Sequence, residues 1–234
     1  GDVLRKLLML VAGAAAILLV FGETLLPAWA RQTAETMLRD RGAESAEVTV
    51  ESTPGILFLL GQIDTLKIDA KGLRIGDLRM ERVQLTGSGV HFSSRDLFLD
   101  HRVHLISAED LKLTGVVSED ALRNLLAKRI DKIDNIKVTI DEDGVHATAE
   151  VKIFGRMADV VLEGKIVEDA QALYFHMTRL DIKNALIGKA NLGDIFGDIQ
   201  IAKLDALPLK TRIESVEHRK GAIVVHLSAG GNEE

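Results

Sequence analysis

The sequence predicts an α+β fold built on a long antiparallel sheet with one dry face and one wet face. Short segments of alternating apolar and polar residues recur along most of the chain, polar turns separate them, and few segments have helical spacing. Alternation with a period of two is typical of half-buried strands, and short turns join antiparallel neighbours. A chain of 234 residues, 47% apolar and 27% charged, can form a packed core.

The clearest predicted strand covers residues 145–153, where Val145, Ala147 and Ala149 alternate with polar residues. The acidic turn 141–144 joins it to a predicted strand over 136–140, which together form a hairpin. The same alternation predicts strands at 48–50, 66–70, 82–86, 103–105, 111–113, 173–177 and 222–227, with a turn at 219–221.

Helical spacing interrupts the strands in a few places. Ser118 is a typical N-cap, and the helix that follows it, to Ile130, has one apolar stripe: Leu122, Leu125, Leu126 and Ile130. A weaker helix is predicted over 191–199 from the spacing of Leu192, Ile195, Phe196 and Ile199, although Gly193 and Gly197 disfavour it. A third short helix is predicted over 31–42. Two or three short helices cannot cover the apolar face of such a long sheet. The sheet must therefore curl on itself, pair with another molecule or enclose something apolar.

The N-terminal segment, residues 1–30, predicts export. Arg5 and Lys6 precede an uncharged apolar run, Leu7–Gly22, which extended to Leu26 is about 30 Å long as a helix and can span a bilayer. Ala28-Trp29-Ala30 has the small-x-small pattern of a signal-peptidase site. Either a cleaved signal peptide ends at Ala30 or an uncleaved transmembrane anchor remains. Both alternatives place residues 31–234 outside the cytoplasm as a single domain.

Several function classes find no support in the sequence. The net charge is −6 and no basic stripe is present, which argues against nucleic-acid binding. The chain has no cysteine, which excludes disulfides and thiolate metal sites. No nucleophile, nucleotide-binding or zinc-protease motif occurs. The histidines of the strands fall on wet positions, where solvated side chains are the ordinary explanation. We therefore expect no enzyme, no metal and no cofactor.

One apolar run remains unexplained by the sheet. Ile56–Leu60 are five consecutive apolar residues between Pro54-Gly55 and Gly61. A half-wet strand does not need such a run, so it is either a buried crossover beneath the sheet or a loop that meets an apolar phase.

Four segments, in this order, resemble the LmeA-like phospholipid-binding proteins of bacterial envelopes. In residues 54–70 a proline and the apolar run are followed by Gly-x-hydrophobic-Asp at Gly61–Asp64 and then an alternating strand. Residues 72–92 and 111–130 resemble the next two segments, and 207–230 the closing Leu-Pro, hairpin and terminal glycine. The resemblance spans about residues 46–230.

This resemblance implies a fold similar to the tubular lipid-binding proteins: a curved antiparallel sheet wrapped around one or two helices, enclosing an apolar groove. It implies non-catalytic binding, with transfer as an option, of phospholipid or a related envelope lipid at the outer face of the cytoplasmic membrane. The residues then expected to contact lipid are Ile56, Leu57, Phe58, Leu59, Leu60, Leu122, Leu125, Leu126, Leu192, Ile195, Phe196 and Ile199.

Two other hypotheses stay open. The first is a structural envelope domain whose apolar face is closed by a protein partner. The second is an enzyme on envelope lipids that uses histidine and carboxylate side chains, which the residues favour least. Lipid that copurifies with the exported domain would favour lipid binding, whereas a protein complex without lipid would favour the structural domain.

Overall fold

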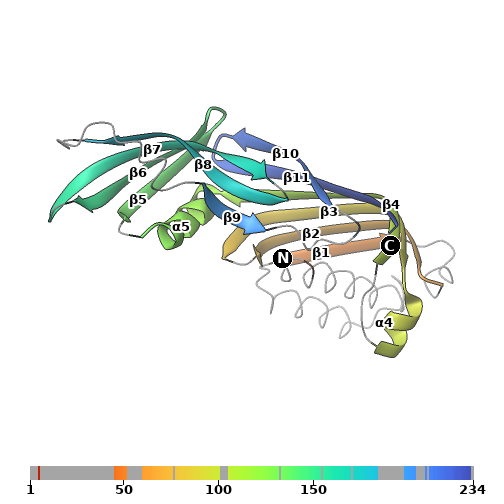
Figure 1. Ribbon diagram of the computed structural model, residues 1–234. Helices are drawn as coiled ribbons and strands as arrows, with labels where there is room; N and C mark the ends of the chain where they lie inside the picture. The colour runs from red at the N-terminus through yellow and green to blue at the C-terminus, as the bar shows by residue number, and fades with distance from the viewer. Residues whose placement is uncertain are drawn as a thin grey trace. The chain divides into compact units, whose positions relative to one another are not determined.

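The computed structural model describes residue 5 and residues 45–51, 60–75, 77–100, 105–131, 133–153, 155–169, 171–183, 198–203, 209 and 211–232 (Figure 1). The N-terminal run predicted to span a membrane or act as a signal, and the helix predicted over 31–42, lie outside these residues. Within them, no helix has the length and apolar character that a membrane crossing requires.

Most of the described chain is β-strand, and every strand pair whose register is defined is antiparallel. The strands form two sheets, where the sequence pattern predicts one. The six-stranded sheet has the order β1-β2-β3-β4-β11-β10, and the five-stranded sheet has the order β5-β6-β7-β8-β9. The strands are β1 (Ser45–Glu51), β2 (Gln62–Ile75), β3 (Leu78–Phe92), β4 (Leu105–Ser118), β5 (Ile133–Asp141), β6 (Gly144–Ile153), β7 (Arg156–Asp169), β8 (Ala172–Ile182), β9 (Ile199–Lys203), β10 (Arg212–Arg219) and β11 (Ala222–Asn232).

The chain divides into two compact units. Unit 1 comprises Gly1–Gly115, Ala206–Ser215 and His226–Glu234, and unit 2 comprises Val116–Asp205 and Val216–Val225. The chain therefore passes from one unit to the other within β4, β10 and β11.

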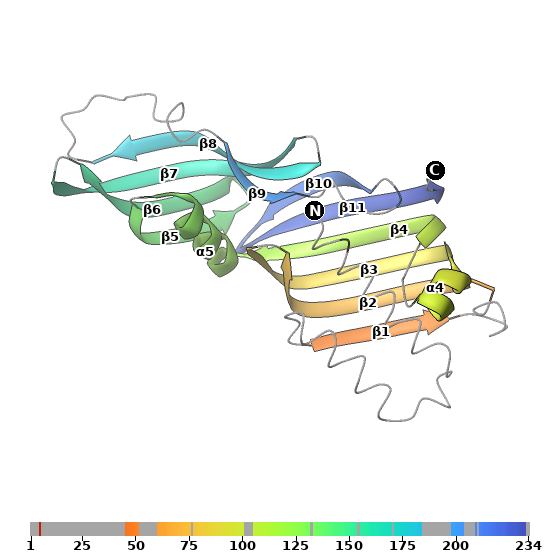
Figure 2. The same ribbon diagram turned by 60° about the horizontal axis from the view of Figure 1, so that its bottom comes forward.

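The strands of the six-stranded sheet lie side by side in Figure 2, and burial alternates along its central rows. Leu66 lies opposite Gly87, Ile68 opposite Leu85 and Ala70 opposite Val83, and all of these residues are buried. Their neighbours in sequence, such as Lys67 and Gln84, are exposed. The predicted alternation is confirmed here, and it gives the sheet an apolar face on β2 and β3.

The alternation shifts by one residue near the end of the sheet where β2 begins. Ile63 and Val90, which pair with each other, are buried, although they are out of phase with Leu66 and Leu85. The shift occurs beside Gly89, whose φ of 54° lies in the left-handed region that glycine adopts without strain. The register between β2 and β3 is the same on both sides of this point, so no residue is inserted and only the phase of the buried side chains changes.

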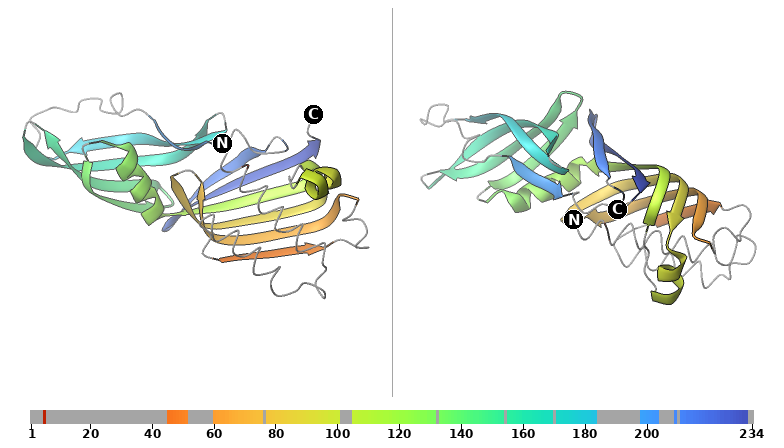
Figure 3. Two further views of the ribbon diagram at one scale, coloured as in Figure 1. Left: turned by 90° about the horizontal axis from the view of Figure 1, so that it is seen from below. Right: turned by 45° about the vertical axis from the view of Figure 1, so that its right-hand side comes forward.

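The five-stranded sheet belongs to unit 2, and it curls so that helix α5 (Glu119–Arg129) lies within its curve, packed beside β5 (Figure 3). Its buried phase includes Ile136, Val138 and Ile140 of β5, with Val160 and Leu162 of β7. The backbone N–H of Ile140 also donates to Glu119 Oε2 over 2.7 Å. The curled sheet around a helix thus agrees with the predicted curvature for this unit.

The predicted helix start and turns, which depend on contacts between residues close in sequence, are confirmed. The Ser118 hydroxyl accepts a hydrogen bond from the N–H of Ala121 over 3.2 Å, which caps α5 where the sequence predicts its start. Asp141 Oδ1 accepts hydrogen bonds from the N–H groups of Asp143 and Gly144, which form the predicted turn between β5 and β6. The turn at 219–221 separates β10 from β11.

Two helix predictions differ from the structure. Ile199 begins strand β9 and pairs with Phe175 of β8, so the helix predicted over 191–199 is wrong at that residue. Ile199 and Ile201 are β-branched, which favours strand over helix. Helix α4 (Ser94–Asp100) was not predicted. It begins after Ser93, whose hydroxyl accepts from the N–H of Asp96, and its seven residues are too few to show a helical period.

Candidate lipid-binding site

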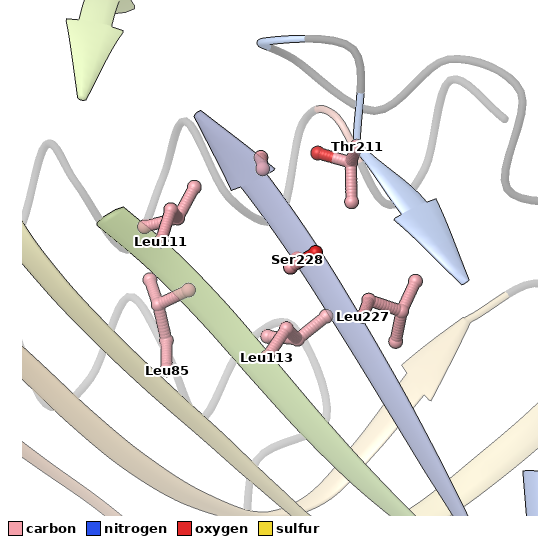
Figure 4. Close-up of a pocket in the computed structure, with 7 residues that line it drawn as sticks. Leu85, Leu111, Leu113, Thr211, Leu227 and Ser228 are labelled. Atoms are coloured by element: carbon pink, nitrogen blue, oxygen red, sulfur yellow. The ribbon is translucent and has the colours of Figure 1, made fainter. Parts of the chain in front are cut away.

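A hollow with an apolar lining lies on the six-stranded sheet within unit 1 (Figure 4). Counted out to where it opens to solvent, its empty volume is ≈ 210 Å³. Neighbouring strands β3, β4 and β11 supply most of the lining, and Thr211 lies directly before β10. The lining residues are Leu85, Leu111, Leu113, Thr211, Leu227, Ser228 and Ala229.

Strand alternation explains why these side chains meet. Leu111 and Leu113 are two apart on β4, so both belong to its buried phase, and Lys112 between them is exposed. The side chain of Leu111 also lies beside Gly87 of β3, where a Cβ would be 3.1 Å from Leu111 Cδ1. The glycine therefore leaves room for a leucine of the next strand, and the hollow forms where small and large residues alternate.

The two polar residues of the lining carry hydroxyl groups and no charge. Ser228 Oγ donates to Glu214 Oε1 over 2.6 Å, so its proton is directed to a partner on β10. Thr211 is 6% exposed. Among the described residues, no charged side chain lines this hollow, so a charged headgroup would lose its hydration there without gaining a charged partner. The lining is suited to a hydrocarbon chain.

The volume limits what can enter. Pockets that bury a whole small molecule usually measure about 300–1,000 Å³. The enclosed part of the hollow measures only ≈ 10 Å³, about the space of one water molecule, and the rest of the ≈ 210 Å³ is open to solvent. In this conformation the hollow is a shallow apolar depression, and its side chains have to move apart before an acyl chain can enter. Each methylene that leaves water for such a lining contributes about 0.8 kcal/mol.

A family model for LmeA-like phospholipid-binding proteins matches residues 21–228, nearly the whole chain. The chain belongs to the LmeA-like phospholipid-binding family. The order of four sequence segments had indicated this membership, and the match confirms it. Neither the curated proteins nor the solved structures include a match to this chain.

The lipid-contacting residues predicted for this LmeA-like protein lie in different places. Leu60 is a turn residue directly before β2 and is 65% exposed. Leu122, Leu125 and Leu126 are each 0% exposed in α5 of unit 2, and Ile199 is half-buried in β9. The other predicted residues, Ile56–Leu59 with Leu192, Ile195 and Phe196, lie outside the described part of the chain. Lipid contact at all twelve residues stays a prediction.

The residues that line the hollow were not predicted from the sequence. The segments 82–86, 111–113 and 222–227 were predicted as strands, but nothing in them indicates that β4 and β11 are neighbours. Thr114 Oγ1 and His226 Nδ1 lie 3.4 Å apart although the residues are 112 positions apart in sequence. Such a long-range pairing needs the tertiary structure.

The histidines of unit 2 have ordinary polar partners. His176 Nδ1 lies 2.7 Å from Asp198 Oδ1, and His146 Nε2 lies 3.0 Å from Asp141 Oδ2. Burial acts to raise the pKa of Asp141, but the nearby His146 imidazole and the hydrogen bonds from the N–H groups of the turn outweigh it and lower that pKa. Among the described residues, no three histidine or acidic side chains are grouped as a metal site would require.

Proposed function

We propose that this protein binds phospholipid, or a related envelope lipid, without catalysis. In this proposal an acyl chain of the lipid contacts the apolar face of the six-stranded sheet. The observation that carries the proposal is the hollow on β3, β4 and β11, whose lining is apolar and uncharged. Membership of a phospholipid-binding family supports it from a separate direction.

The place of action is proposed from the sequence. Arg5 and Lys6 before the uncharged run Leu7–Gly22 support a location at the outer face of the cytoplasmic membrane. A protein that extracts or delivers lipid needs access to a bilayer, so binding there is compatible with transfer of lipid between membranes.

Organic extraction of the purified protein followed by mass spectrometry tests lipid binding directly. Ala229→Leu adds bulk to a half-buried position in the hollow and should lower the ratio of bound lipid to protein. Ala158→Leu is the matched control, because Ala158 is also a half-buried strand alanine and lies on β7 in unit 2. Its lipid ratio should equal that of the wild type.

Two results would contradict the proposal. The first is a purified protein that carries no lipid and takes none from added vesicles. The second is an equal loss of lipid in both alanine variants while both stay folded, because binding would then not depend on the hollow. A stable complex with a protein partner and no lipid would favour the structural-domain alternative instead.

A further inference from the structure

Three of the four large hydrophobic side chains that are exposed in the described residues belong to one end of the six-stranded sheet. Leu60 is 65% exposed directly before β2, Leu99 is 68% exposed in α4, and Ile106 is 43% exposed at the start of β4. The fourth, Met157, is 52% exposed on β7 of unit 2. Leu60, Leu99 and Ile106 are called the apolar edge below.

Backbone pairing places the apolar edge together. The N–H of Phe92, the last residue of β3, donates to the carbonyl of Gly61 over 2.9 Å, which fixes Leu60 beside the end of β3. Helix α4 begins at Ser94, two residues after Phe92, and carries Leu99 in its last turn. Strand β4 begins at Leu105, five residues after α4 ends at Asp100.

Strand β4 is the neighbour of β3 in the sheet, and Ile106 is its second residue. A Cβ added at Gly89 of β3 would meet the side chain of Glu109, and one added at Gly87 would meet Leu111. The first residues of β4, which include Ile106, therefore lie along the last residues of β3.

The apolar edge and the hollow lie on neighbouring strands of one sheet and share β4. Ile63 pairs with Val90, and both are buried, as is Ala108 of β4. Leu85 of the hollow is seven residues from Phe92 along β3, about 23 Å at the rise of a strand. Ile63 and Val90 are out of phase with Leu85, so the buried side chains change phase between the edge and the hollow.

We propose that the apolar edge docks into the interfacial region of a phospholipid bilayer. The inference rests on the proposed function, because a lipid destined for the hollow leaves or enters a bilayer, and an edge that docks at the end of the same sheet shortens its path through water. In the sequence, Leu60 ends the apolar run Ile56–Leu60, and Leu99 ends Leu97-Phe98-Leu99, which has Arg95-Asp96 before it and Asp100 and Arg102 after it. A short run of leucine and phenylalanine between charged residues can place its apolar side chains at a bilayer surface while the charges stay in water.

The absence of cysteine from the sequence allows a site-by-site test on the full chain. Leu60→Cys, Leu99→Cys and Ile106→Cys are each labelled with a fluorophore that responds to polarity, and Met157→Cys is the matched control from unit 2. The labelled proteins are mixed with vesicles of phosphatidylcholine and phosphatidylglycerol. Labels on the apolar edge should shift to shorter emission wavelength and be quenched by brominated phosphatidylcholine, whereas the label at 157 should do neither. Because each label reports its own position, binding through the N-terminal run does not produce this pattern.

Several results would overturn the proposal. They are unchanged emission at all three edge positions, an equal shift at position 157, or an edge shift that depends on protein concentration without vesicles, which indicates a protein interface. Measuring the lipid that copurifies with the same variants distinguishes a failure of this proposal from a failure of the proposed function. Edge labels that enter the bilayer in a protein without bound lipid would overturn lipid binding and support docking, and the reverse result would overturn docking alone.

Discussion

At the scale of single residues, Gly61 shows how one position constrains the start of β2. Its φ is 83°, and a Cβ added there would lie 2.2 Å from the carbonyl oxygen of Phe92. Gly155, between β6 and β7, has a similar φ of 77° but no atom within 4 Å of the added Cβ. The two glycines therefore share the backbone conformation and differ in the space around it.

We predict that Gly155→Ala costs about 1–2 kcal/mol of unfolding free energy, the usual cost of a left-handed residue with a side chain. Gly61→Ala should cost at least about 1 kcal/mol more, because its methyl group also displaces backbone that hydrogen-bonds to Phe92. Urea melts of both variants measure the difference. Equal losses would show that the close approach to Phe92 contributes nothing.

At the scale of elements, two hydrogen bonds fasten the turn end of the β10–β11 hairpin within unit 2. The N–H of Gly221 donates to the carbonyl of Ile140 on β5 over 2.8 Å. The N–H of Ile166 on β7 donates to His218 Nε2 over 3.0 Å. The second bond requires His218 to be neutral, because a protonated imidazole has no acceptor atom.

Burial lowers the pKa of His218 below its ordinary value, and the positive charge of Lys165 lowers it further, against a smaller opposing effect of Asp141. The unfolded chain therefore takes up this proton more readily than the folded chain. His218 contributes its stability above the unfolded pKa of about 6.5, and the contribution is lost as pH falls through and below that value.

The expected result is a melting temperature that falls more steeply between pH 7 and pH 5 for the wild type than for His218→Gln. Glutamine offers an amide oxygen as acceptor and does not titrate in this range. Thermal melts at several pH values provide the measurement, and His176→Gln serves as the control, because His176 is exposed and pairs with Asp198. Parallel slopes for wild type and His218→Gln would rule out this role of His218.

At the scale of the whole molecule, sequence reasoning succeeded where the physics is local. Ser118 caps a helix and Asp141 forms a turn through atoms a few residues away, so both could be predicted. The division into two sheets, and the pairing of β4 with β11 that builds the hollow, depend on residues more than a hundred positions apart. Alternation shows which side chains of a strand are buried, but it does not identify the neighbouring strand. The proximity of Leu85, Leu113 and Leu227 could therefore not be predicted from the sequence.

The last prediction concerns where the whole chain resides. Positive residues before a long apolar run tend to stay on the cytoplasmic side, so we predict that Arg5 and Lys6 direct the chain after the run across the membrane. Protease added to intact spheroplasts of bacteria that express the full chain should therefore digest the part after residue 30, while a cytoplasmic enzyme in the same cells survives. Replacing both basic residues with glutamate should reduce the digested fraction, because the charge asymmetry that orients the run is lost. Digestion only after lysis would contradict export, and it would also remove the proposed location at the outer face while leaving lipid binding by the hollow to be judged on its own test.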